Sequence, residues 1–185
     1  MSRSEHATTT ILPGHQGGDG RVPASPLSVS ACSTGPAGTR PDPETLVTRG
    51  TNRWSREGEP TIYLASDPGV ALAELGRHWD EQSGDVAVWT VTLELAAAAD
   101  LRDASVRARL GVPDDPSWIF DVERCQSLAS RVREAGTHDG IVVPSVAMLD
   151  DPARWNAVVF VDRLPRTLAD AVAVEGQVTW IKRPR

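Results

Sequence analysis

The sequence lacks the features that mark several large classes of protein. It has no excess of positive charge, because 19 Lys and Arg residues stand against 25 Asp and Glu residues and give a net charge of −6. This balance argues against a protein that mainly grips nucleic acid or an anionic membrane surface. No apolar run approaches the roughly 18 residues of a membrane span, and the first residues, MSRSEHATTTILPGHQGG, lack the apolar segment of a signal peptide. We therefore expect a soluble, cytoplasmic protein that does not bind membranes or nucleic acid directly.

Cysteine and tyrosine are also scarce. The two cysteines, Cys32 and Cys125, are too few and too far apart to form a metal-ligand cluster or a disulfide framework. His78 and His138 do not complete a metal site or a Ser/His/Asp triad. Tyr63 is the only tyrosine, beside two phenylalanines and six tryptophans. The sequence therefore gives no support for a metal site.

The chain divides by composition near residue 44. Residues 1–44 are rich in Gly, Pro, Ser and Thr and show little hydrophobic periodicity, so they bury too little apolar surface to offset chain entropy. We predict that most of this N-terminal tail is disordered, with LSVSAC (27–32) as an alternative short strand. Residues 45–185 have the texture of one folded domain that is long enough for a hydrophobic core.

Hydrophobic periodicity within 45–185 predicts both helices and strands. Alternation in DVAVWTVTLEL places Ala87, Trp89 and Val91 on one face of a strand. Pro68 suits a first helical turn after Ser66 or Asp67 as N-cap. We predict strands at 61–65, 85–95, 140–145, 156–162 and 177–183, and helical segments from 68 to about 80 and at 103–111, 119–136 and 167–173. The order of these elements indicates an α+β fold with a largely antiparallel or mixed central sheet.

Glu74 is the most unusual residue of this pattern. It falls on the helical face made by Ala71, Leu75 and His78, where an apolar side chain is expected. Desolvating a carboxylate costs far more than ordinary packing returns, so a buried Glu needs partners or a function. The plainer interpretation is that Glu74 lies at the edge of the apolar stripe and pairs with Arg77 or His78. For a lone Glu on an amphipathic helix, the plainer interpretation is favoured.

Five other residues have a functional and a structural interpretation. Arg53 and Arg56 are either solvated loop residues or a clamp for phosphate, to which a guanidinium is well suited. Trp54 and Tyr63 are ordinary core aromatics unless a ligand stacks on them. Ser145 follows a strand, where a hydroxyl often only closes a turn, and no G-x-S-x-G motif surrounds it.

Taken in order, these residues resemble a known family. The segments NRW-SREGEPTIYLASDPGVALAE, HDGIVVPS and NAVVFV are similar to the RES domain, which is named for an Arg, a Glu and a Ser in that order. Arg53 matches the Arg that precedes Trp, Tyr63 the strand Tyr, Glu74 the helix Glu and Ser145 the Ser. The resemblance spans roughly residues 46–165.

The chain departs from the family pattern at one point. Family members usually carry a further Arg on an N-terminal strand roughly 20 to 30 residues before the Arg-Trp pair. Here Arg21, Arg40 and Arg49 are the basic candidates, and none has an aromatic neighbour. If that Arg is missing, the pocket is expected to bind its ligand weakly or to be inactive.

The resemblance implies an ADP-ribosyltransferase-like fold with NAD in a cleft, in a toxin of a bacterial toxin–antitoxin pair. It implies cleavage of the nicotinamide–ribose bond by inorganic phosphate or water, without a metal. Glu74 and Arg53 are the catalytic candidates, and Tyr63 and Ser145 complete the NAD-binding set. The expected partner is a helical, DNA-binding antitoxin that blocks the cleft. Two alternatives are a protein ADP-ribosyltransferase and an inactive nucleotide- or partner-binding module.

Overall fold

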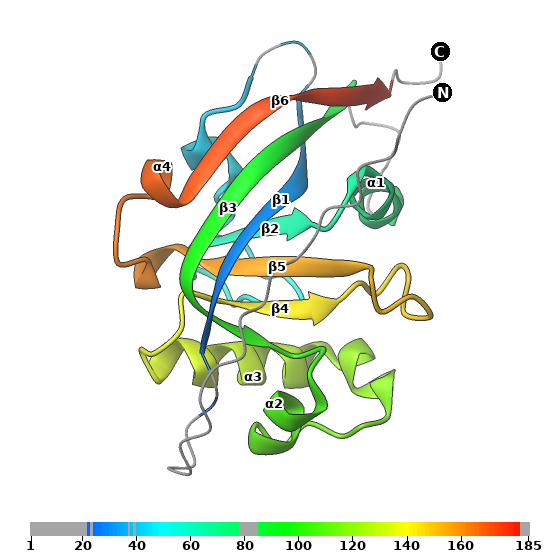
Figure 1. Cartoon of the computed structure of the whole chain (residues 1–185). Coiled ribbons are helices and arrows are strands. Elements are labelled where there is room, and N and C mark those ends of the chain that lie inside the picture. The colour runs from blue at the N-terminus through cyan, green and yellow to red at the C-terminus, as the bar shows by residue number, and fades with distance from the viewer. Residues whose placement is uncertain (1–21, 23, 37, 39, 78–84, 182–185) are drawn as a thin grey trace.

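The computed structural model describes residues 22, 24–36, 38, 40–77 and 85–181 (Figure 1). The strands are β1 (Ser25–Pro36), β2 (Thr61–Ala65), β3 (Val86–Asp100), β4 (Gly140–Pro144), β5 (Trp155–Phe160) and β6 (Val172–Ile181). The α-helices are α1 (Pro68–Gly76), α2 (Ala104–Arg109), α3 (Val122–Glu134) and α4 (Leu168–Ala171). Short 3₁₀ helices occupy Pro43–Leu46, Pro116–Phe120 and Val161–Arg163.

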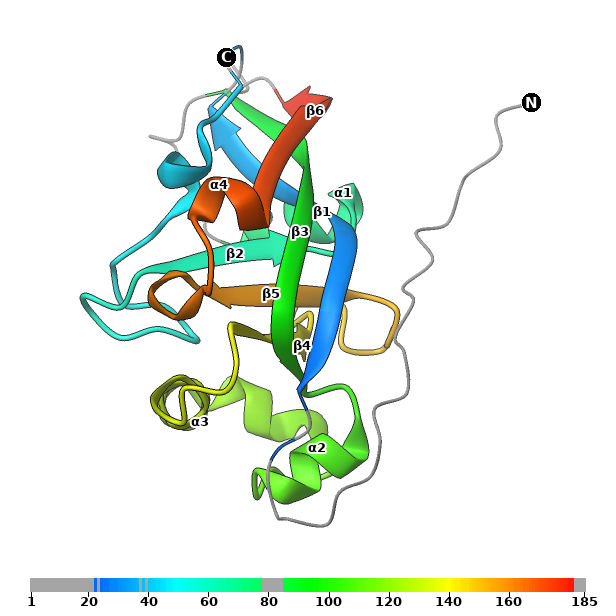
Figure 2. The same ribbon diagram turned by 60° about the vertical axis from the view of Figure 1, so that its left-hand side comes forward.

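The six strands form one mixed sheet that closes on itself. Their order is β1-β2-β5-β4-β3-β6, and β1 also pairs with β3. Strands β1 to β5 therefore make a barrel, to which β6 is added along β3 (Figures 1 and 2). β3 and β4 run parallel, whereas the pairs β1–β2, β1–β3, β2–β5, β4–β5 and β3–β6 run antiparallel. The predicted mixed α+β architecture is confirmed.

Alternation along the strands fills the barrel. Ala87, Trp89 and Val91 of β3 belong to the main hydrophobic cluster, as the sequence pattern predicts, together with side chains from β1, β2 and β5. A second cluster lies between the sheet and helices α2 and α3, and a third lies under α1. The two longest helices, α1 and α3, thus cover different parts of the sheet (Figure 2). None of the described helices combines the length and the apolar character needed to span a bilayer.

The prediction of a disordered tail is wrong for residues 25–36, whereas the alternative of a strand at 27–32 is confirmed. This stretch forms β1, which pairs with β3 from Ser25↔Ala98 to Pro36↔Val86. The 3₁₀ helix Pro43–Leu46 begins in the last two residues of the predicted tail. The small and polar side chains of β1 give a weak signal along the sequence, and the strand is stabilised by a partner some sixty residues later in the chain. Residues 1–21, 23, 37 and 39 of the predicted tail lie outside the described residues.

Other element boundaries shift by several residues. β3 runs on to Asp100, beyond the predicted end at 95, and β6 begins at Val172 instead of 177. Helix α1 ends at Gly76 with Arg77 as its C-cap. The predicted continuation of this helix to residue 80, His78 included, lies outside the described residues, as do residues 182 and 183 of the last predicted strand.

Candidate functional site

Helix α1 is held in place at its N-terminus by Asp67. The Asp67 Oδ1 atom accepts hydrogen bonds from the backbone N–H groups of Gly69 (2.8 Å) and Val70 (3.2 Å), and Pro68 occupies the first turn. Arg154 forms an ion pair with the same carboxylate. Partial burial alone would raise the pKa of Asp67, but the hydrogen bonds from Arg154 and Val70 outweigh it and lower the pKa. This cap fixes the direction of the helix that carries Glu74.

Three donors converge on one oxygen of Glu74. Its Oε1 atom accepts hydrogen bonds from Ser145 Oγ (2.8 Å), Asn156 Nδ2 (2.9 Å) and the backbone N–H of Ala147 (3.4 Å). The Oε2 atom receives no hydrogen bond from any described residue. The alternative of an edge Glu74 paired with Arg77 is not observed, because the Arg77 guanidinium donates instead to the Val146 carbonyl (3.3 Å).

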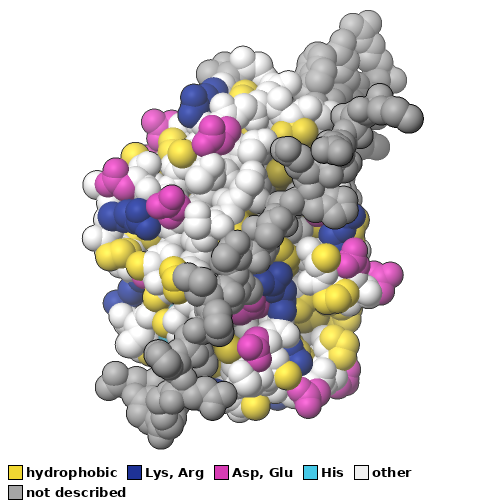
Figure 3. All heavy atoms as spheres, in the orientation of Figure 1, with side chains coloured by type: hydrophobic (Ala, Val, Ile, Leu, Met, Phe, Trp, Pro, Cys, Tyr) yellow, Lys and Arg dark blue, Asp and Glu magenta, His cyan; other side chains and the backbone are white. Residues whose placement is uncertain are grey.

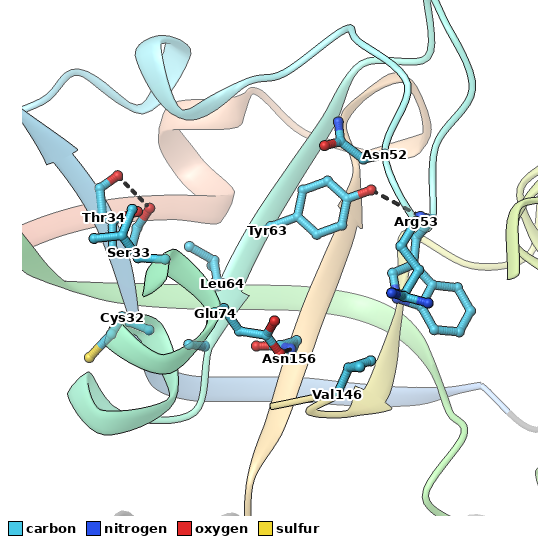
Figure 4. A pocket seen from close by; sticks show the side chains of 14 residues that line it. Cys32, Ser33, Thr34, Asn52, Arg53, Tyr63, Leu64, Glu74, Val146 and Asn156 are labelled. Atoms are coloured by element: carbon cyan, nitrogen blue, oxygen red, sulfur yellow. Dashed lines mark hydrogen bonds between the residues drawn. The ribbon is translucent and has the colours of Figure 1, made fainter. Parts of the chain in front are cut away.

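The half-buried Glu74 lines a cavity of about 300 Å³. The cavity lies where β1 and β2 diverge, since these two strands pair only at Cys32↔Ala65. Its walls come from β1, the Arg-Trp turn, β2, α1 and β5 (Figure 4). The lining residues that carry polar side chains are Cys32, Ser33, Thr34, Asn52, Arg53, Tyr63, Glu74 and Asn156. Glu74 is the one carboxylate and Arg53 the one cation among the described lining residues.

Arg53 reaches this cavity from a short turn before β2. The turn is closed by Asn52 and Ser55, whose backbones form an isolated β-bridge. The Arg53 Nη1 atom donates to the carbonyl of Ile119 (2.5 Å), and no carboxylate among the described residues pairs with this guanidinium. Its positive charge is therefore not neutralised by a neighbouring side chain in this part of the structure. The neighbouring Trp54 is buried and packs edge-on against Trp118. Trp54 is therefore mainly a core residue, as the structural interpretation predicts.

Helix α3 secures the same turn from outside. Gln126 Nε2 donates to the carbonyls of Asn52 (2.8 Å) and Ser55 (3.4 Å). Arg56 is exposed and donates to Ser127 Oγ (3.3 Å), so it supports the turn and does not line the cavity. Because the turn packs on α3, the position of Arg53 is fixed more firmly than it would be in a free loop.

Tyr63 presents its ring to the cavity (Figure 4). Its hydroxyl accepts a hydrogen bond from the backbone N–H of Trp54 (3.3 Å) and lies 3.1 Å from Ser55 Oγ. Burial is the main cause that raises the pKa of Tyr63, so the hydroxyl stays neutral at physiological pH. The hydroxyl is occupied by the Arg-Trp turn, and the ring face is the part that is left for a ligand.

The structure brings Arg53, Tyr63 and Glu74 to one cavity and places the buried Ser145 directly behind Glu74. It does not bring the other basic candidates there. Arg40 and Arg49 are exposed and do not line the cavity, and Arg21 lies outside the described residues. The wall formed by β1 instead presents Cys32, Ser33 and Thr34.

Sequence reasoning missed Asn156. It stands in the segment NAVVFV, whose apolar pattern is typical of a buried strand. Its partner Glu74 is 82 positions away along the chain, so only the fold reveals the hydrogen bond. A polar residue at the start of an otherwise apolar central strand was the available signal.

The chemistry open to these residues is charge stabilisation and hydrogen bonding. Cys32 is not a ready nucleophile, because burial and the nearby Asp67 carboxylate raise its pKa to about 11 and keep the thiol protonated at neutral pH. Among the described residues, no group of three His, Cys, Asp or Glu side chains is placed to hold a metal ion. A carboxylate and a guanidinium across one cavity suit a substrate that carries both developing positive charge and phosphate.

Comparisons with known proteins show the family and the fold of the chain. The model of the RES domain family matches residues 29–181. The probable NAD(+) phosphorylase Rv3189 of Mycobacterium tuberculosis is 33% identical over 125 residues, which are 63% of this chain and 57% of that protein. The chain thus spans less than two thirds of that relative. A chain in the crystal structure of the M. tuberculosis MbcT–MbcA toxin–antitoxin complex has the same fold, with a TM-score of 0.64 and 17% identity over 86% of both chains.

Proposed function

Because the chain belongs to the RES domain family, we propose that it cleaves the bond between nicotinamide and ribose in NAD. The observation that carries this proposal is Glu74, whose Oε1 atom is tied by three donors while Oε2 receives none from the described residues. A half-buried carboxylate with one fixed and one available oxygen is suited to stabilise a positive charge that forms beside it. The relative named as a probable NAD(+) phosphorylase supports the same substrate.

The proposed reaction passes through an oxocarbenium-like ribose, as glycoside hydrolysis does. When the bond from the ribose carbon to nicotinamide breaks, its electron pair goes to the ring nitrogen and neutralises the cationic pyridinium. Positive charge moves to the ribose, where Glu74 stabilises the transition state more than the ground state. The ring of Tyr63 stacks on the nicotinamide end, and Ser145 orients Glu74.

Phosphorolysis is the preferred form of this reaction. A phosphate anion attacks the ribose carbon without losing a proton first, so no second base is needed. Water would have to give up a proton, and Glu74 is the only carboxylate among the described cavity residues. Arg53, which has no carboxylate partner among the described residues, is proposed to bind the attacking phosphate or a phosphate of NAD. Hydrolysis would require Glu74 to act as a base as well.

Incubation of the purified protein with NAD, with and without inorganic phosphate, tests the proposal. Chromatography is expected to show phosphate-dependent loss of NAD, with nicotinamide and an ADP-ribose phosphate as products. Free ADP-ribose at the same rate in both conditions would indicate a glycohydrolase. Unchanged NAD in both conditions would contradict the proposal.

A second candidate function follows from the β1 wall of the cavity. Cys32, Ser33 and Thr34 stand there, and no second Arg lines the cavity among the described residues. With a single guanidinium, a module that binds a nucleotide without turnover is the alternative, and calorimetry with NAD would detect it. Transfer of ADP-ribose to a protein is a further alternative, which would appear as a mass increase of the target protein.

For the biological setting we propose a toxin with an antitoxin partner, as in the toxin–antitoxin complex that shares the fold. The partner is expected to be helical, to bind DNA and to block the cavity. On the face in Figure 3, acidic and basic side chains are interspersed, which together with the net charge of −6 favours a protein partner over direct nucleic-acid binding. An ADP-ribosyltransferase-like fold, with β1 in addition to the predicted residues 45–185 as its catalytic part, and a cytoplasmic location complete the proposal.

A further inference from the structure

Asn156 has no role in the reaction described so far, although it contacts the central carboxylate. Its Nδ2 atom donates to Glu74 Oε1 at 2.9 Å, which is as close as the contact made by Ser145. An amide NH₂ group only donates hydrogen bonds, so this contact marks Oε1 as an acceptor. Asn156 also lines the cavity, whereas Ser145 lies behind Glu74 and does not.

The backbone of Asn156 is fixed on both sides. β5 lies between β2 and β4, and Asn156 is paired with Ala65 on one strand and with Val143 on the other. A residue in a central strand cannot shift without breaking two ladders of hydrogen bonds. Its side chain leaves the sheet on the same face as Val158, which packs in the cluster under α3. The amide therefore offers Glu74 a donor whose place is set by the barrel.

A single donor would not fix the Glu74 carboxylate. The terminal torsion of a Glu side chain is broad, so the carboxylate plane turns freely unless contacts from different directions hold it. Ser145 and Ala147 approach from the loop after β4, and Asn156 approaches from β5. Because all three end on Oε1, their combined effect is to hold Oε2 as the oxygen available to a ligand.

We propose that Asn156 is a positioning residue, which together with Ser145 fixes the rotation of the Glu74 carboxylate so that Oε2 meets the ribose. This inference rests on the proposed NAD-cleaving function for its consequence, but the hydrogen bond itself can be tested without turnover. A misplacement of about 1 Å at a catalytic group lowers rates by roughly 100-fold. Asn156 should thus act on the chemical step and leave substrate binding nearly unchanged.

Two substitutions separate geometry from packing. Asn156→Asp keeps the shape but replaces the donor with an acceptor facing Oε1, and Asn156→Leu removes the donor with little change in size. Both are expected to lower kcat about 10- to 100-fold, with KM within about twofold. Val158→Ala, on the same strand and face, is the matched control. It should lower the melting temperature by creating a cavity and should leave kcat unchanged.

Retention of wild-type kcat by both Asn156 variants would overturn the proposal. The proposal would also fail if Val158→Ala, with the same melting temperature as the Asn156 variants, lost as much kcat as they do. A second measurement does not depend on activity. In ¹⁵N-labelled protein, the side-chain NH₂ signals of Asn156 are expected to shift in the Glu74→Ala variant. Those of Asn52, whose amide donates to the Gly50 carbonyl (3.0 Å), should not shift.

The two measurements distinguish the possible failures. If the wild-type protein leaves NAD intact, the proposed function fails, and the NMR comparison still decides whether Asn156 holds Glu74. If NAD is cleaved but the Asn156 signals do not respond to Glu74→Ala, the hydrogen bond is absent in solution and the positioning role is refuted.

Discussion

Replacing Glu74 with glutamine removes the charge and keeps the shape. The Gln carbonyl oxygen can still accept the hydrogen bonds that Ser145 and Asn156 now give to Oε1. The fold should therefore persist, with a melting temperature within about 3 °C of the wild type. The position of Oε2 is then taken by an NH₂ group, which has no negative charge to offer to the ribose.

The size of the effect follows from Coulomb's law. A carboxylate oxygen ~4 Å from the developing positive charge contributes about 4 kcal/mol at an effective dielectric constant of ~20, which suits a cavity open to water. Each 1.4 kcal/mol or so corresponds to a tenfold change in rate. Glu74→Gln should thus lower kcat for NAD cleavage roughly 1,000-fold.

A discontinuous assay of nicotinamide release at saturating NAD and phosphate would measure this change. Glu175→Gln is the matched control, because Glu175 is an exposed residue of β6 outside the cavity and loses the same charge. The control should retain wild-type kcat. If Glu74→Gln keeps more than a tenth of the wild-type kcat, the carboxylate does not stabilise the transition state, and the proposed mechanism is wrong.

Three further predictions concern stability and binding. Asp67→Ala should lower the free energy of unfolding by about 1–2 kcal/mol at pH 7. Because the pKa of Asp67 is lowered in the folded state, the stability that its carboxylate contributes is fully present above about pH 4. Chemical denaturation should therefore show that the difference between variant and wild type shrinks as the pH falls below this value. Tyr63→Phe leaves the Trp54 N–H without its acceptor and should lower stability by about 1–2 kcal/mol while KM for NAD stays constant; a large rise in KM would mean that the hydroxyl binds substrate. Deletion of residues 1–36 removes β1 and should abolish cooperative unfolding seen by circular dichroism; a folded truncated protein would show that β3 does not need this partner.

The sequence predicts the fold best where a pattern is long and local. The alternation in β3 identifies its barrel face, and Asp67 with Pro68 identifies the start of α1. The last part of β3 is a run of alanines that gives no alternation, and its strand conformation comes from pairing with β1 and β4. Such pairing joins segments far apart in the chain, so no window of sequence contains it.

The same distinction holds for the candidate site. Arg53, Tyr63, Glu74 and Ser145 are found from the sequence because they sit in recognisable segments, and the structure gathers them around one cavity. For Asn156 the sequence shows only a polar residue in an apolar strand, because its contact with Glu74 joins β5 to α1. The missing second Arg of the cavity is a question that the sequence raises, and the described wall of β1 contains none.

The place of β5 in the barrel determines when, during synthesis of the chain, the candidate site can be completed. This strand joins β2 to β4 and is the last to be synthesised of the five that close the barrel. A nascent chain that ends before residue 155 contains Arg53, Tyr63 and Glu74 but neither Asn156 nor the closing strand. In such a chain the Glu74 carboxylate lacks the donor that Asn156 supplies from β5. The proposed cleavage of NAD can therefore begin only after β5 has been synthesised and the barrel has closed.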